Sequence, residues 1–65
     1  MNMKVVFDDD SWFIGHRGFF EKWDESKDCH HFKVIHGSSD FHSSIGTEIA
    51  VHLSKPKFFI LNVKL

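Results

Sequence analysis

The sequence contains few of the residues that brace or interrupt small folds. It has one Cys, one Pro and four Gly among 65 residues. A single Cys cannot form an internal disulfide, which excludes the disulfide frameworks of many small secreted domains and favours a reducing, cytoplasmic location. No Pro-rich, Gly-rich or Ser-rich linker divides the chain, so one compact domain is expected over residues 1–65.

Long hydrophobic stretches are missing as well. The longest uninterrupted apolar run near the C-terminus is FFIL, over residues 58–61, whereas a membrane-spanning helix needs about 20 apolar residues. The first ten residues contain one Lys and three Asp, and they lack the basic start and long apolar stretch of a signal peptide. Neither a membrane anchor nor secretion is therefore expected.

The charge of the chain is close to balanced. Eight Lys and Arg against nine Asp and Glu give a net charge of −1. Proteins that bind nucleic acid by counterion release usually present a basic face, so nucleic acid is not expected to be the main partner. Tight docking to another protein and homo-association are both permitted, because a small net charge causes little self-repulsion.

Aromatic residues, in contrast, are abundant in the chain. Eight Phe and two Trp make up 15% of the chain. A domain of this size buries only about 60% of the surface of its unfolded chain. Its core holds about five or six large rings, so the sequence predicts that some of the ten remain partly exposed.

A β-hairpin is predicted near the start of the chain. Residues 3–7 (MKVVF) form a short β-rich run, and residues 11–14 (SWFI) resume it. The three residues between them, Asp8, Asp9 and Asp10, favour a turn whose carboxylates face solvent.

The stretch after this hairpin fits two structures. Phe19, Phe20 and Trp23 have the spacing of an apolar helical face, but a strand is preferred. The reason is that WFIGHRGFF places aromatic residues on both sides of a four-residue loop bracketed by Gly, as in many hairpins.

The second half of the chain predicts a strand, a helix and a further strand. The first strand covers residues 31–36 and ends at a Gly-Ser-Ser-Asp turn. The helix is expected to begin at Thr47, because Gly46 would weaken a longer helix by about 1 kcal/mol relative to Ala. Two patterns compete there: alternation from Thr47 to Leu53 fits a half-buried strand, whereas a helix fits the apolar residues that recur every fourth position, Phe41, Ile45, Ile49 and Leu53.

The last strand covers residues 57–65 and is apolar on both faces for four residues. This pattern predicts a central or covered strand. Together the elements predict an α+β fold, a small, mostly antiparallel sheet of three to five strands with one helix on a face. A small all-β barrel is the alternative.

Four of the six His and the only Cys lie within residues 28–42. A structural zinc site needs four ligands, usually from two closely spaced pairs. In a regular strand, His30 and His36 would share a face but lie about 20 Å apart. Only His36, His42 and His52 then remain as residues that could converge on one metal ion. Three such residues do not complete a zinc site, so no metal ligand is assigned. A His-based metal-binding protein is kept as an alternative function.

Enzyme activity is not favoured by the sequence. Phosphate-binding loops, paired-Cys zinc spacings and nucleophile elbows are absent from it, so no cofactor is expected. The run HHFKVIH places imidazoles beside Lys33 and suggests a second alternative, a small His-dependent RNA-cleaving toxin. Such an enzyme needs a basic groove, which this weakly acidic chain does not favour.

The aromatic hairpin carries the main functional hypothesis. Trp and Arg are the residues most enriched at the energetic centres of interfaces, so Trp12, Arg17, Phe20 and Trp23 are candidate anchors. The predicted protein is a non-enzymatic inhibitor or adaptor that sterically blocks a larger host enzyme or complex. A phage or mobile element is the expected origin, because small domains without motifs are frequent among their accessory proteins. A homodimer through the C-terminal strand is the second partner considered.

Overall fold

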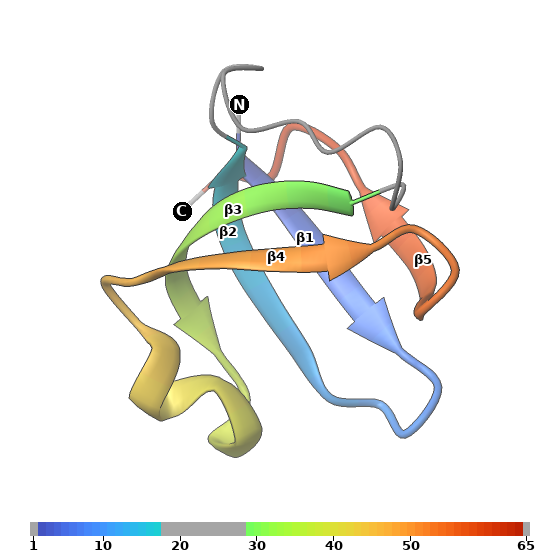
Figure 1. The fold of residues 1–65 in the computed structure, drawn as a ribbon, viewed down its shortest axis with the longest axis horizontal. Helices are drawn as coiled ribbons and strands as arrows, with labels where there is room; N and C mark the ends of the chain where they lie inside the picture. Colours follow the sequence, from blue (N-terminus) through green and yellow to red (C-terminus); the bar gives the residue numbers. More distant parts are fainter. Residues whose placement is uncertain (1, 18–28, 65) are drawn as a thin grey trace.

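The computed structural model describes residues 2–17 and 29–64, which form five strands and one short 3-10 helix (Figure 1). In chain order these elements are β1 (Asn2–Phe7), β2 (Trp12–Arg17), β3 (Cys29–Gly37), η3 (Ser39–Ser44), β4 (Glu48–His52) and β5 (Pro56–Ile60). The predicted return strand with Phe19, Phe20 and Trp23 lies outside the described residues.

The five strands form one antiparallel sheet in the order β4-β3-β2-β1-β5. The last strand pairs with the first, so β4 and β5 are the two edges of the sheet. The sheet curls into a half-barrel that is open between these edges (Figure 1). The predicted α+β class is wrong, because the only helix among the described residues is the six-residue η3. The architecture is closer to the all-β alternative, although the sheet is not a closed barrel.

The predicted first hairpin is confirmed. Asp10 N–H donates to the carbonyl of Phe7 at 3.0 Å, and Phe7 N–H donates to the carbonyl of Ser11 at 2.9 Å. This pattern is typical of a three-residue hairpin loop, in which the last residue has a left-handed backbone conformation. Asp10 is that residue, and its φ is 68°. Asp tolerates that region better than most residues. The Asp9 carboxylate accepts hydrogen bonds from the hydroxyl and the backbone N–H of Ser11, which lower the pKa of Asp9.

The predicted helix from Thr47 is wrong, and the alternating strand pattern describes this segment correctly. Residues 48–52 form β4, which pairs with β3. Gly46 has φ 84°, a conformation that does not continue a helix. Backbone hydrogen bonds then attach the segment to β3, from Val34 N–H to Thr47 and from Gly46 N–H to Val34. The four-residue repeat of apolar side chains therefore does not belong to one helix: Phe41 lies in η3 and Ile49 in β4, and Ile45 and Leu53 follow these elements.

The C-terminal strand is shorter than predicted and lies at an edge of the sheet. β5 covers Pro56–Ile60 and has β1 as its only neighbour among the described strands. Phe58 and Ile60 on its outer side are 45% and 44% exposed. The prediction that this strand is central or covered is therefore wrong.

The core lies on the concave inner face of the sheet. Phe13 and Phe32 are fully buried and meet edge to face, with ring centroids 5.4 Å apart. Phe41 of η3 covers one end of the core, at 5.1 Å from Phe13 and 5.5 Å from Phe7. The other buried apolar core residues on this face are Met3, Val5, Val34 and Val51.

The side chain of Ser38 holds η3 against β2. Its hydroxyl accepts a hydrogen bond from Trp12 N–H at 3.0 Å and donates one to the Trp12 carbonyl at 3.1 Å. The backbone N–H of Ser38 donates to the same carbonyl. The turn after β3 is thereby fixed to the start of β2, which keeps Phe41 over the core.

Candidate functional site

The outer face of the sheet is divided into an apolar half and a polar half. The polar half lies on β3 and β4, where His31 Nδ1 is 3.6 Å from Glu48 Oε1 and Lys33 pairs with Glu48. The apolar half lies on β2, β1 and β5. We call it the outer apolar patch and define it by Val6, Trp12, Ile14, Phe58 and Ile60; Phe58 and Ile60 are exposed, Trp12 and Ile14 are half-buried, and Val6 is buried between them.

Strand register explains why the patch is continuous. Trp12 pairs with Val6, and Val6 pairs with Phe58, so these three side chains form one cross-strand row. Ile14, Lys4 and Ile60 form the adjacent row. Paired residues of antiparallel strands point to the same face, with Cβ atoms about 5 Å apart. The patch therefore runs from the middle of the sheet to its β5 edge.

Two Lys side chains lie over aromatic rings of the patch. Lys4 Nζ is 4.5 Å from the Trp12 ring centroid, and Lys57 Nζ is 5.9 Å from that of Phe58. Lys57 also forms an exposed ion pair with Asp10, at 3.0 Å. Lys4 therefore adds a positive charge beside the Trp12 ring, whereas the charge of Lys57 is balanced by Asp10.

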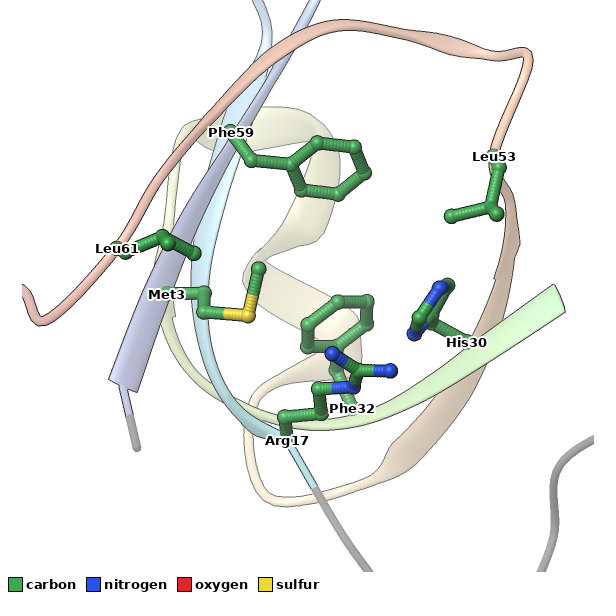
Figure 2. Close-up of a pocket in the computed structure, with 7 residues that line it drawn as sticks. All are labelled: Met3, Arg17, His30, Phe32, Leu53, Phe59 and Leu61. Carbon is green, nitrogen blue, oxygen red and sulfur yellow. The ribbon is translucent and has the colours of Figure 1, made fainter. Parts of the chain in front are cut away.

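A pocket lies on the opposite, concave face (Figure 2). It occupies about 260 Å³ where the half-barrel is open, between β4 and β5. Arg17 and His30 point into it from the ends of β2 and β3, and the remaining lining is apolar: Met3, Phe32, Leu53, Phe59 and Leu61. Burial, and then the neighbouring guanidinium of Arg17, lower the pKa of His30.

The candidate anchors from the sequence do not form one surface in the described structure. β2 pairs with β1 without any irregularity, so Trp12 and Arg17, five residues apart, point to opposite faces. Trp12 belongs to the outer apolar patch, and Arg17 lines the pocket. Phe20 and Trp23 lie outside the described residues.

Three residues of the patch and the pocket are not among those predicted from the sequence: Phe58, Ile60 and His30. Phe58 and Ile60 were expected to be covered, because an apolar run does not reveal whether its strand is central or at an edge. His30 was treated as one of several similar imidazoles. The strand period of two could have identified His30, because a residue two positions before a buried Phe points to the same face as that Phe.

The His cluster is dispersed by the fold. The register between β2 and β3 shifts after Ile14, so His36 pairs with Ile14 while Val34 pairs with Gly15. This bulge breaks the alternation, and His36 points to the outer face, away from His30. Among residues 2–17 and 29–64 no group of three His, Cys, Asp or Glu side chains could hold a metal ion.

The described structure also separates the imidazoles invoked for an RNA-cleaving site. His30 and His31 point to opposite faces of β3, and His31 lies beside Glu48. The Ser54 hydroxyl is 2.7 Å from His52 Nδ1, but that nitrogen also accepts the Ser54 backbone N–H at 3.1 Å. Both contacts join residues two positions apart and lie in the exposed turn after β4.

Helices long and apolar enough to cross a bilayer are not found in the part of the chain that the structure describes. Comparison of the chain with protein-family models, with curated proteins and with solved structures found no match.

Proposed function

We propose that this protein is a non-enzymatic interaction module of the inhibitor or adaptor type, which binds another protein through the outer apolar patch and the β5 edge. The observation that carries the proposal is the exposure of Phe58 and Ile60, 45% and 44%, in continuous rows with Trp12 and Ile14. Contiguous exposed apolar patches on small proteins commonly mark interaction sites.

The contrast between the two halves of the outer face supports this proposal. Both halves belong to the same antiparallel sheet, and the half on β3 and β4 carries His31, Lys33 and Glu48. A strand with one solvated face normally alternates apolar and polar residues. β5 departs from this rule, because the apolar residues Phe58 and Ile60 lie on its solvated outer side. A bound partner would remove both side chains from water.

The chemistry of the surface indicates the kind of partner. β5 is a short edge strand, so an extended segment of a partner could pair with its backbone, as in strand addition. Lys4 and Lys57 lie among the aromatic rings of the patch. The expected partner segment therefore carries apolar residues that cover Phe58 and Ile60, and an acidic residue that faces Lys4.

The mechanism is steric: the bound module covers the partner's own surface or joins it to a second protein. Docking of this kind needs no cofactor. The lone Cys favours action in the reducing cytoplasm. An origin in a phage or mobile element and a larger host protein as the target remain part of the proposal.

The test begins with a photoreactive phenylalanine analogue at position 58, introduced in cells of the source organism. The matched control carries the analogue at position 43 on η3, an exposed position away from the patch. A protein that crosslinks only from position 58 is then purified and titrated with the module. Phe58→Ser and Ile60→Ser should each weaken its binding by about thirtyfold, as at interface hot spots.

Leu53→Ser is the control for the titration, because Leu53 is an exposed apolar residue on the pocket side. It should leave the affinity for the partner unchanged. Equal crosslinking from positions 58 and 43, or full affinity of both β5 variants, would contradict the proposal. A crosslink to a second copy of this chain, with a dimeric mass in light scattering, would replace the heterologous partner by a homodimer.

A further inference from the structure

The pocket on the concave face is independent of the outer apolar patch and has the features of a small-molecule site. Its floor is formed by Met3 and Phe32, both buried, whereas Leu61 at its mouth is 59% exposed. The pocket is thus open to solvent and closed below by the core. Ligand sites are typically concave, mostly apolar, and equipped with a few polar groups that orient the ligand.

The polar groups of the pocket lie together on one side. Figure 2 shows the Arg17 guanidinium next to the His30 imidazole, with Met3, Phe59 and Leu61 on the other side of the pocket. Arg17 is always charged, and its fork of five N–H donors matches a carboxylate in two parallel hydrogen bonds. With that many donors, Arg17 can add a ligand carboxylate to the contacts it already makes.

The size of the pocket limits the ligand. Its volume of about 260 Å³ corresponds to roughly eight or nine groups the size of a water molecule or a methylene. A short apolar chain fills this space, and a large cofactor does not fit.

From this arrangement we propose that the pocket binds a small monocarboxylate with an apolar tail of medium length. Its carboxylate lies on Arg17 beside His30, and its tail lies against Met3, Phe59, Leu53 and Leu61. The tail gains from leaving water, and the carboxylate gains a charge-assisted, bidentate contact beside an apolar wall. A molecule with only the tail, or with only the carboxylate, should therefore bind more weakly than one with both.

The experiment is an NMR titration of the full chain with sodium octanoate, followed through the methyl groups of Met3, Leu53 and Leu61. We expect saturable shifts of these signals. Octanol, which has the same tail without the charge, should bind at least about tenfold more weakly, because a hydrogen-bonded charge contributes about that factor. Acetate, which has the charge without the tail, should cause no saturable shift.

Variants assign the two halves of the site. Arg17→Gln should weaken octanoate binding by about tenfold and leave octanol binding unchanged. Leu61→Ser, at an exposed position just after β5, should weaken both ligands. Phe58→Ser on the outer face is the matched control and should alter neither.

Two results would overturn the inference: no saturable methyl shift with octanoate up to about 10 mM, or equal affinity for octanoate and octanol in the unmodified chain. If Arg17→Gln does not fold, the comparison of octanoate with octanol and the Leu61→Ser variant still decide. Since these measurements use only the purified chain, their outcome is separate from that of the partner experiment.

Discussion

Substitution of Gly15 by Ala tests the packing of the core around two buried rings. A Cβ atom at this position of β2 would lie 3.0 Å from the Phe13 ring, 3.0 Å from Phe32 Cβ and 3.1 Å from the carbonyl oxygen of Lys33. Both rings are fully buried, and the third neighbour is backbone. None of the three neighbours is the free end of a flexible side chain, so the added methyl group must displace part of the core.

Two opposing effects set the size of the change. Overpacking of a core costs about 1–3 kcal/mol. Replacing Gly by Ala within a strand returns about 0.5–1 kcal/mol, because Ala loses less backbone freedom on folding. The net loss in the free energy of unfolding should be about 1 kcal/mol, which lowers the melting temperature of a domain this small by roughly 4–8 °C.

Urea denaturation of the two proteins measures this difference. Ala50→Gly serves as the control, because Ala50 lies exposed on β4 and its substitution reports the Gly–Ala difference without core packing. Ala50→Gly should lose about 0.5–1 kcal/mol. If Gly15→Ala is instead more stable than the unmodified protein, by the amount that Ala50→Gly loses, the neighbouring atoms yield without cost and the packing argument is refuted.

Three further predictions concern single side chains. Because its surroundings lower the pKa of His30, the unfolded chain binds the proton more readily, and the free energy of unfolding should fall as pH drops below about 6.5. His30→Gln should flatten this dependence in urea denaturation between about pH 7.5 and 5, and equal slopes for the two proteins would contradict it. The pKa of Asp9 is also lowered, so its contribution is present above pH 3.8 and is lost as pH falls through the lower value. In thermal melts, Asp9→Asn should reduce the loss of stability on acidification, and an unchanged acid limb would count against the Ser11 contacts. Phe41→Ala removes ring contacts at 5.1 and 5.5 Å and should destabilise by about 3 kcal/mol in urea titration, whereas the exposed Phe58→Ala should cost less than about 1 kcal/mol. A loss from Phe41→Ala as small as that expected for Phe58→Ala would contradict the role of Phe41 in the core.

The parts of the fold that depend on neighbours in sequence were predictable. The first hairpin needs only two β-rich runs and the three Asp between them. The strand at residues 31–36 was also correct, although β3 extends it to Cys29–Gly37. In both cases the pattern itself encodes the pairing partner or the end of the element.

The parts that depend on distant contacts were not predictable. Residues 47–54 fit a helix and a strand equally well, and their pairing with β3 decided the outcome, as tertiary context often does. β5 has an apolar pattern typical of a covered strand, but the sheet order places it at an edge. Neither fact can be read from the local sequence.

The same limit applies to the candidate site. An excess of rings was expected to leave some partly exposed, and Phe58 is an exposed ring among the described residues. The residues chosen as anchors come from the hairpin, whereas two of the exposed large apolar side chains, Phe58 and Ile60, lie on β5. The bulge that turns His36 away from His30 leaves no signal in the spacing of the imidazoles.

The pairing of β1 with β5 has a consequence for how the chain folds. Lys4 and Ile60 are partners in this ladder, so the contact closes a loop that contains almost every described residue. Closure of so long a loop is entropically slow, and sheets rich in such contacts fold in milliseconds to seconds. During synthesis on the ribosome, β1 must therefore wait beside β2 until residues 56–60 have emerged, with one of its backbone edges accessible to chaperones and to neighbouring nascent chains.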